Sequence, residues 1–194
     1  FRDAGVNTPD WIYATPDSCS VEYVREKIGF PCVIKPTSCG SSVGISIVES
    51  EGGYARALEF AEKYESNIII EKKICGRELT VGILDGEVLP VIEIIPLSGF
   101  YDYENKYQSG KTLEVCPAQI DGDVLRRLHE QTKLGFSALR LSGYARFDFT
   151  PWCLEANTLP GMTPTSLLPQ MAAERGMDYG ELCMKIVLTA LGKC

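Results

Sequence analysis

The stretch RFDFTPWCLEANTLPGMT, which runs from Arg146 to Thr163, decides how the chain is interpreted. Polar and apolar residues alternate in its first half, and a period of two predicts a strand with one buried face. Arg146 and Asp148 then share one face of this strand, while Phe147 and Phe149 take the other. The first half therefore predicts a strand with a charged pair on one side and an apolar wall on the other.

A second predicted strand follows directly along the chain. Glu155 and Asn157 share one of its faces, and we expect Trp152, Leu154 and Ala156 on the opposite, apolar face. If the two strands pair, their polar faces form a single surface. That surface carries two carboxylates, an amide oxygen and a guanidinium group.

Oxygen donors of this kind predict a metal site. Asp148, Glu155 and Asn157 offer the hard oxygen ligands that Mg²⁺ prefers, and Arg146 beside them suits a negatively charged reacting group. The alternative is a surface hairpin with a solvated salt bridge. That alternative explains the charges but not the proline-glycine turn at 160–161, directly after them.

Composition argues against several classes of protein. The net charge of −7 disfavours a nucleic-acid partner, because proteins that bind phosphate backbones are usually basic. No apolar run reaches membrane-spanning length, so we expect no membrane partner. The eight cysteines are scattered without a CxxC pair, which indicates reduced thiols in a cytoplasmic protein. The single histidine, His129, lies in a charged helical stretch, so Ser-His or Cys-His nucleophilic chemistry is not expected.

The order of the predicted elements favours an α+β fold over a doubly wound parallel sheet, because hairpins recur along the chain. Helices are expected within 20–27, 53–64, 121–139, 164–175 and 179–191, and strands within 32–35, 45–48, 67–71, 78–84 and 88–95. The helix at 121–139 is expected to turn four apolar residues inward: Leu125, Leu128, Phe136 and Leu139. We expect two α+β lobes, residues 1–74 and 75–194, with a cleft between them.

The glycine- and serine-rich loop at residues 37–44 is a candidate phosphate site. Its backbone N–H groups and the hydroxyls of Ser41 and Ser42 can surround phosphate oxygens, and Lys35 enters the same corner from the end of a strand. The loop matches neither the dinucleotide-binding fingerprint nor the P-loop. A plain hairpin loop is the alternative.

Two further segments each allow a functional and a structural interpretation. Residues 68–74 are either a hinge whose backbone contacts a purine edge, with Glu78 reaching the ribose, or an edge strand guarded by charge. The aromatic segment 100–107 is either a lid with Lys106 at its tip or a loop packed on the core. Together, the loop, the lysines, the lid, the carboxylates and the arginine are the parts that phosphoryl transfer needs.

These segments resemble the D-alanine–D-alanine ligase family of the ATP-grasp superfamily. The resemblance rests on motifs that cover nearly the whole chain in order: VIKPTSCGSSVG (33–44), IIEKKICGRELTV (69–81), FYDYENKY (100–107), CPA (116–118), ARFDF (145–149) and LEANTLPGMTPTSLLP (154–169). It implies an ATP-grasp fold with ATP between two lobes, a central subdomain at 1–74 and a C-terminal subdomain at 75–194. The activity implied is ATP-dependent ligation of two D-alanine molecules through an acyl phosphate, for peptidoglycan synthesis.

The resemblance also implies roles for individual residues. Nucleotide contacts fall on Lys35, Ser42, Glu71, Lys72, Ile74 and Glu78, with Glu71 and Ile74 at the adenine and Glu78 at the ribose. Two Mg²⁺ ions, or Mn²⁺ in their place, fall on Asp148, Glu155 and Asn157. Arg146 and the Gly161 N–H would stabilise the oxyanion, and Lys106 would contact the transferred phosphate. Ser41 and Tyr107 would help to close the lid. Ser166 and Leu167 would bind the carboxylate of the second substrate.

The family has an N-terminal domain that this sequence does not contain, so we expect the chain to be the ATP-binding part of a larger enzyme, inactive by itself. Members are usually dimeric, and the expected full-length protein is a cytoplasmic homodimer acting on D-alanine and ATP. Two alternatives are a non-catalytic module that binds Mg-ATP and an ATP-grasp ligase with another acid and amine.

Overall fold

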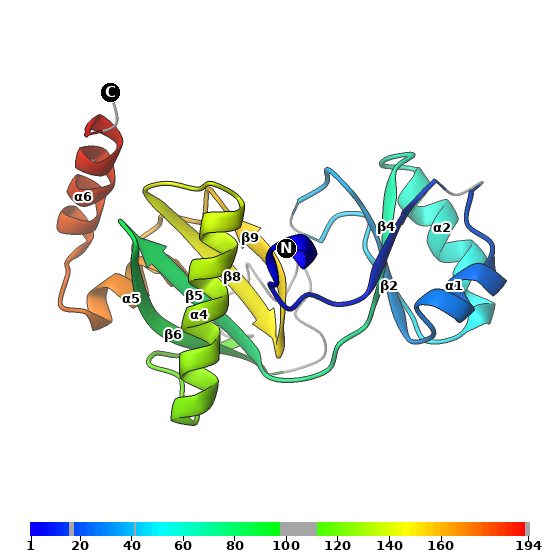
Figure 1. Ribbon diagram of the computed structural model, residues 1–194, viewed down its shortest axis with the longest axis horizontal. Coiled ribbons are helices and arrows are strands. Elements are labelled where there is room, and N and C mark those ends of the chain that lie inside the picture. Colours follow the sequence, from blue (N-terminus) through cyan, green and yellow to red (C-terminus); the bar gives the residue numbers. More distant parts are fainter. Residues whose placement is uncertain (16–17, 41, 98–111, 193–194) are drawn as a thin grey trace. The chain divides into compact units, whose positions relative to one another are not determined.

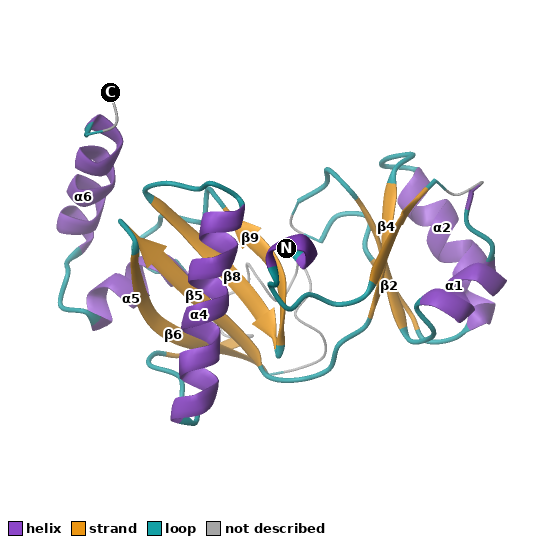
Figure 2. Cartoon of the chain, in the orientation of Figure 1, coloured by secondary structure: helices purple, strands orange, loops and turns teal. Residues whose placement is uncertain are grey.

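The computed structural model describes residues 1–15, 18–40, 42–97 and 112–192. These residues form two compact units, one built from Pro9–Ile74 and the other from Phe1–Thr8 together with the described residues of 75–97 and 112–192 (Figure 1). Each unit combines an antiparallel sheet with helices, as Figure 2 shows. The expected α+β class is therefore confirmed.

The Pro9–Ile74 unit has a four-stranded sheet in the order β1-β4-β2-β3. Its elements are β1 (Trp11–Ala14), α1 (Val21–Lys27), β2 (Cys32–Pro36), β3 (Ser46–Val48), the 3₁₀ turn η3 (Glu51–Gly53), α2 (Tyr54–Glu62) and β4 (Ile68–Lys72). Ser20 begins α1 as expected, because its hydroxyl accepts a hydrogen bond from the Tyr23 N–H. Residues 37–44 connect β2 to β3.

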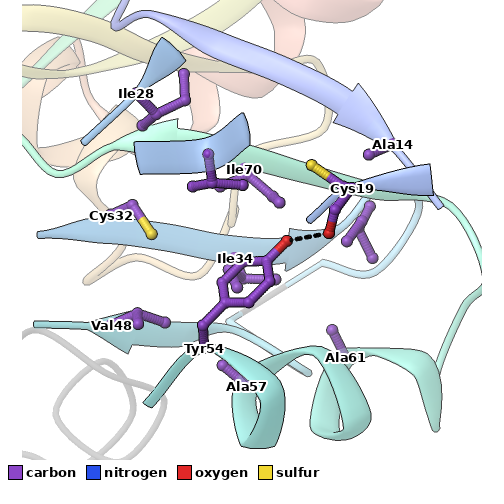
Figure 3. Close-up of a cluster of buried hydrophobic side chains, with 12 residues drawn as sticks. Ala14, Cys19, Ile28, Cys32, Ile34, Val48, Tyr54, Ala57, Ala61 and Ile70 are labelled. Atoms are coloured by element: carbon purple, nitrogen blue, oxygen red, sulfur yellow. Dashed lines mark hydrogen bonds between the residues drawn. The ribbon is translucent and has the colours of Figure 1, made fainter. Parts of the chain in front are cut away.

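One face of this sheet is covered by α1 and α2, and the core of the unit lies between the sheet and these helices. Ile34, Ile68 and Ile70 are fully buried on that face. The ring of Tyr54 enters the same core, and its hydroxyl donates to the carbonyl oxygen of Cys19 at 2.8 Å (Figure 3). Alternate residues of β2 and β4 therefore point to the uncovered face, which carries the polar side chains of this unit.

The other unit has a five-stranded sheet in the order β7-β6-β5-β8-β9. Its elements are η1 (Arg2–Ala4), β5 (Glu78–Leu84), β6 (Glu87–Pro96), β7 (Thr112–Val115), α4 (Gly122–Ala138), β8 (Tyr144–Thr150), β9 (Trp152–Asn157), α5 (Leu167–Glu174) and α6 (Tyr179–Leu191). The strand β7 was not among the strands expected from the sequence. Within the ranges described, no helix has the length and apolar character to cross a membrane.

Opposite faces of the five-stranded sheet are covered by different helices. Leu128 of α4 packs with Val81 and Phe147 on one face. A methyl group on Gly82, whose position points to the other face, would lie 2.7 Å from Leu168 of α5. Thr80, Gly82, Arg146 and Asp148 are cross-strand neighbours on this second face, so the polar residues of β8 share the side of the sheet on which α5 packs.

Two of the residues expected to face inward from α4 are instead exposed. Leu128 is buried and Phe136 packs against the core, but Leu125 and Leu139 are 36% and 45% exposed. Val124, next to Leu125 in the sequence, packs against the core instead, so the first turn of α4 reaches the apolar surface but presents a different residue to it. Periodicity alone therefore did not identify the buried stripe of this helix.

The first eight residues pack with the five-stranded sheet. The rings of Phe1 and Phe147 lie with their centroids 6.3 Å apart, and Val6 is buried. The carbonyl of Asn7 accepts a hydrogen bond from the Cys153 N–H at 2.8 Å, while the Asn7 N–H donates to Gln131. These residues extend the apolar layer beneath β8 and β9.

Candidate active site

The polar residues of β8 and β9 meet because the two strands pair in antiparallel register. Asp148 lies opposite Glu155, and Arg146 lies opposite Asn157. Side chains of directly opposed residues on one face are close neighbours. The pairing that the alternation predicted is thus present, and it gathers two carboxylates, an amide and a guanidinium group on the face shared with α5.

The carboxylate of Asp148 is the centre of this cluster. Arg146 donates to it twice, from Nε to Oδ1 at 3.0 Å and from a terminal nitrogen to Oδ2 at 2.8 Å. Thr80, on the neighbouring strand β5, donates its hydroxyl to Oδ1 at 2.6 Å. Two strands therefore fix the orientation of Asp148, so its carboxylate is held ready for a ligand rather than sampling several rotamers.

Charge and hydrogen bonding keep Asp148 ionised. Burial by itself would raise the pKa of this carboxyl group, but the positive charge of Arg146 and the hydrogen bonds from Arg146 and Thr80 outweigh it and hold the pKa below its usual range. Asp148 is therefore a carboxylate at neutral pH. A carboxylate is the form that binds a cation.

Asn157 joins the two carboxylates. Its amide nitrogen donates to Asp148 Oδ2 at 2.9 Å and to Glu155 Oε1 at 3.1 Å. The positive end of the amide dipole thus occupies the point on which both acidic side chains converge. A divalent cation bound between the carboxylates would take the place of this N–H group, and the amide would then present its oxygen instead.

The donor set fits Mg²⁺. Two carboxylates and an amide oxygen are hard donors, and Mg²⁺ in proteins is usually held by one or two carboxylates together with substrate phosphates. Among the residues that the structure describes, no three His, Cys, Asp or Glu side chains gather at one point. The site in β8 and β9 thus offers two carboxylates and one amide as candidate donors.

The expected apolar face of β9 is wrong in detail. Trp152 is 42% exposed, whereas Cys153 is 1% exposed and packs in the core. The cause is a β-bulge: Asp148 pairs with Glu155, but the next pair is Phe149 with Cys153, so Leu154 is an extra residue. Burial, and to a lesser extent the charge of Asp148, raises the pKa of the Cys153 thiol to about 12 and keeps it protonated.

The segment after β9 brings Gly161 close to Ser166. A methyl group on Gly161 would lie 3.0 Å from the Ser166 hydroxyl oxygen. That oxygen accepts a hydrogen bond from the Thr163 N–H at 3.0 Å and lies 2.8 Å from the Thr163 hydroxyl. Ser166 is also the residue that precedes α5, and Leu167, the first residue of α5, is buried.

In the Pro9–Ile74 unit, the structure pairs Lys35 with Glu71. The Lys35 ammonium nitrogen lies 2.7 Å from Glu71 Oε1, on the face of the sheet that the helices leave uncovered. Lys72 follows Glu71 on β4, so its side chain points to the opposite face, at the sheet's end. Ile74 lies just beyond β4, where its backbone is outside the ladder, and Glu78 begins β5 in the other unit.

The glycine- and serine-rich loop is described on both sides of Ser41. Ser42 has φ 63° and Gly44 has φ 75°, so two residues of the loop adopt the left-handed conformation. The N–H groups that follow these two residues are used inside the loop, where Val43 donates to the carbonyl of Gly40 at 3.2 Å and Ile45 donates to that of Ser42 at 3.4 Å. Three residues that the sequence singled out, Ser41, Lys106 and Tyr107, lie outside the described residues.

Two residues that contribute to these sites were missed from the sequence. Thr80 is fully buried, and its only signal was a hydroxyl in the otherwise apolar strand β5. Glu65 accepts hydrogen bonds from Thr37 and Ser38 at the start of the loop. Its contacts join residues 27 and 28 positions apart, which no local pattern reveals.

The family described as D-ala D-ala ligase C-terminus matches residues 1–188. Among curated proteins, the chain is 43% identical to the D-alanine–D-alanine ligase of Synechococcus sp. (strain JA-2-3B'a(2-13)), with 100% of this chain and 62% of the relative aligned. It is also 43% identical to the D-alanine–D-alanine ligase of Geobacter sulfurreducens, over 88% of this chain and 56% of the relative. The chain thus spans less than two thirds of the length of these relatives.

Solved structures agree with the sequence relatives. D-alanine–D-alanine ligase from Bacillus anthracis superimposes with a TM-score of 0.87 at 38% identity, over 98% of this chain and 64% of that one. A D-alanine–D-alanine ligase from Bacillus anthracis complexed with ATP gives a TM-score of 0.85 at 34% identity, over 98% of this chain and 62% of that one. The VanG D-Ala:D-Ser ligase from Enterococcus faecalis gives 0.82 at 28% identity, over 96% and 57%.

Proposed function

Because this chain belongs to the D-alanine–D-alanine ligase family and has the ATP-grasp fold of that family, we propose that the full-length protein joins two D-alanine molecules into D-alanyl-D-alanine at the expense of ATP. The product is a building block of peptidoglycan. The proposal places the reaction in the cytoplasm, where ATP and free amino acids are available, and assigns the full-length enzyme a homodimeric state.

One observation carries the proposal: Asp148, Glu155 and Asn157 converge beside Arg146 on paired strands. A ligase that uses ATP must neutralise charge on phosphate groups and on the oxygen of a reacting carbonyl. The cluster provides anionic ligands for a cation and a fixed cation in one place. A solvated surface pair would not need the support that Thr80 gives to Asp148.

Mg²⁺ would be held by Asp148, Glu155 and Asn157. When bound, the ion neutralises phosphate charge and orients the transferred phosphoryl group. Thr80 on β5 and Arg146 on β8 itself hold the Asp148 carboxylate in place. Mn²⁺ prefers the same kinds of oxygen donor and is expected to substitute.

The chemistry that the site would support has two steps. The carboxylate oxygen of the first D-alanine attacks the γ-phosphorus of ATP, which releases ADP and leaves an acyl phosphate. The amine of the second D-alanine then attacks the acyl carbon, and phosphate departs as the peptide bond forms. The positive charge of Arg146 and the N–H group of Gly161 would stabilise the oxyanion of the second step.

The remaining proposed roles concern binding. Lys35 and Ser42 would contact the phosphates of ATP, with Lys35 oriented by Glu71. Nucleotide contacts are further assigned to Glu71, Lys72, Ile74 and Glu78, and contacts to the second substrate's carboxylate to Ser166 and the backbone of Leu167. Lys106 would contact the transferred phosphate, and Ser41 and Tyr107 would help to close the lid.

The direct test uses the full-length protein with ATP, Mg²⁺ and D-alanine. We expect ADP and D-alanyl-D-alanine to form in equal amounts, with no product from L-alanine. A parallel assay with D-alanine plus D-serine addresses the similarity to the D-Ala:D-Ser ligase. Release of ADP that does not depend on D-alanine, or a mixed product in preference to the D-alanine dipeptide, would contradict the proposal.

A further inference from the structure

The start of the glycine- and serine-rich loop is attached to Glu65. Oε1 of this side chain accepts the Thr37 hydroxyl at 2.6 Å and the Ser38 hydroxyl at 2.9 Å. Oε2 accepts the Ser38 backbone N–H at 2.7 Å. One carboxylate therefore satisfies three donors of two consecutive loop residues, and hydrogen bonds to a charged acceptor are the stronger kind.

The end of the loop is attached to the neighbouring residue, Tyr64. A methyl group on Gly44 would lie 2.6 Å from Cγ of Pro36 and 2.9 Å from Cδ2 of Tyr64, so the Gly44 backbone packs tightly between the two rings. The Tyr64 ring is in turn held edge-on against Phe60 of α2, with centroids 5.4 Å apart. Gly44 also has φ 75°, which favours glycine at this position.

We propose that the Tyr64–Glu65 segment positions the loop at residues 37–44 for nucleotide phosphate binding, with Glu65 as a positioning residue that does not itself contact ATP. The inference rests on the proposed function, because it needs the loop to bind phosphate. It goes beyond that function by assigning the loop's geometry to a carboxylate outside the loop. Both ends of the loop are fixed to two consecutive residues that follow α2.

The chemistry explains how a carboxylate can lie beside a phosphate loop. An uncompensated negative charge would repel ATP, but three hydrogen bonds from Thr37 and Ser38 disperse the charge of Glu65. The hydrogen bond from Thr37, followed by that from the Ser38 backbone, lowers the pKa of Glu65, so the group is ionised at neutral pH. Because the Thr37 and Ser38 hydroxyl protons point to Glu65, phosphate contacts are left to the later residues of the loop.

The test compares Glu65→Gln with the wild-type full-length enzyme. A glutamine can offer the Ser38 N–H only a neutral acceptor oxygen, and its NH₂ group can only donate to the Thr37 and Ser38 hydroxyls, so all three hydrogen bonds to a charged acceptor are lost. We expect the KM for ATP to rise about tenfold, the change that loss of a charge-assisted hydrogen bond produces, while the KM for D-alanine stays within about twofold. Glu65→Asp, which keeps both oxygens, is expected to recover part of the ATP affinity.

The matched control is Glu62→Gln. Glu62 ends α2 on the exposed side, three positions from Glu65, and the same charge is removed there without a contact to the loop. We expect wild-type kinetics from this variant. An increase in the KM for ATP equal to that of Glu65→Gln would mean that net charge, and not positioning, is responsible, and would overturn the proposal.

Two further measurements separate this proposal from the proposed function. Hydrogen exchange at the Ser38 amide reads the attachment directly, and we expect it to become at least about tenfold faster in Glu65→Gln; unchanged exchange overturns the proposal. Thr37→Val removes one hydroxyl with little change of shape, so it tests the same contact if Glu65→Gln does not fold. A wild-type enzyme that forms no dipeptide contradicts the proposed function, whereas unchanged ATP affinity in Glu65→Gln contradicts only the positioning role.

Discussion

Asp148 lies directly opposite Glu155 in the β8–β9 ladder, and the amide nitrogen of Asn157 bridges the two carboxylates. Two acids placed this close repel each other unless a positive group lies between or beside them. Here Arg146 compensates Asp148, and the Asn157 N–H group compensates both acids in part. The arrangement keeps Asp148 ionised and leaves a place where one divalent cation would satisfy both acidic side chains together.

Glu155→Gln should weaken the metal site without disturbing the fold. Glu155 is exposed, so the substitution costs little packing, but it removes one of two anionic ligands. We expect the affinity of the full-length enzyme for Mn²⁺ in the presence of ATP to fall about 10- to 100-fold, with kcat lowered by at least about 100-fold. Mn²⁺ titration followed by electron paramagnetic resonance measures the first effect, and Glu87→Gln, on the exposed start of β6, is the control. Wild-type Mn²⁺ affinity would refute the assignment.

Thr80→Val should reduce activity through Asp148. Valine has nearly the shape of threonine but cannot donate to Asp148 Oδ1, a contact of 2.6 Å. Loss of an orienting partner of a metal ligand typically costs about 10- to 100-fold in metal affinity or activity. The pKa of Asp148 should rise as well, so the acid limb of the activity profile should move to higher pH. Thr80→Ser, which restores the hydroxyl, should return the profile to that of the wild type.

Arg77→Ala should destabilise the protein in a pH-dependent way. Arg77 donates twice to Glu93, with both distances 2.6 Å, and this hydrogen-bonded pair lowers the pKa of Glu93. A lowered pKa in the folded state stabilises the protein above the unfolded value of about 4.3 and loses that effect as pH falls through the folded value.

The difference in unfolding free energy between wild type and Arg77→Ala should therefore be about 1 kcal/mol at pH 7, because Arg77 is half exposed and its charge is screened. This difference should shrink as the pH falls through the lowered pKa of Glu93, until only the remaining neutral hydrogen bonds contribute. Denaturant unfolding at several pH values measures it. Arg126→Ala, which removes only exposed pairs on α4, should change stability by less than about 0.5 kcal/mol. An equal effect of both variants at every pH would contradict the expectation.

Two glycines of α4 should respond in opposite ways to alanine. A methyl group on Gly135 would lie 2.8 Å from the Phe147 ring, so Gly135→Ala should lower stability by about 1–3 kcal/mol through overpacking. Nothing lies within 4 Å of the corresponding position on Gly122, so Gly122→Ala should be neutral or stabilise by up to about 1 kcal/mol through helix propensity. Thermal unfolding of both variants provides the comparison, and a stabilised Gly135→Ala would show that α4 can shift away from the sheet.

Periodicity predicted the parts of the fold that depend on local sequence. The alternation around Asp148 gave the correct face for Arg146, Glu155 and Asn157 because a period of two fixes side-chain direction along a strand. The class of the fold followed from the recurring hairpins. The motifs at 145–149 and 154–169, together with those earlier in the chain, predicted the family to which the chain belongs.

Tertiary contacts explain what periodicity could not predict. Trp152 is exposed where an apolar face was expected, and Cys153 is buried in its place, because a bulge changes the phase of β9 without any signal in composition. Leu125 was expected to face inward, but its neighbour Val124 packs against the core in that turn of α4, and helix spacing by itself did not separate the two. Thr80 and Glu65 act on residues distant in the sequence, so their roles emerge only once strands and loops are placed.

The extra residue in β9, Leu154, also determines which changes of length this hairpin can accept. If the ladder were continuous from the Thr150–Trp152 end, Asp148 would oppose Leu154, and Glu155 would turn inward against Phe147. Excision of Leu154 would keep the two acids as partners and make the strand regular. An insertion or deletion of one residue between Glu155 and Asn157 would instead turn one of these two side chains to the opposite face of the sheet. The proposed ligand set therefore depends on the exact length of this short segment.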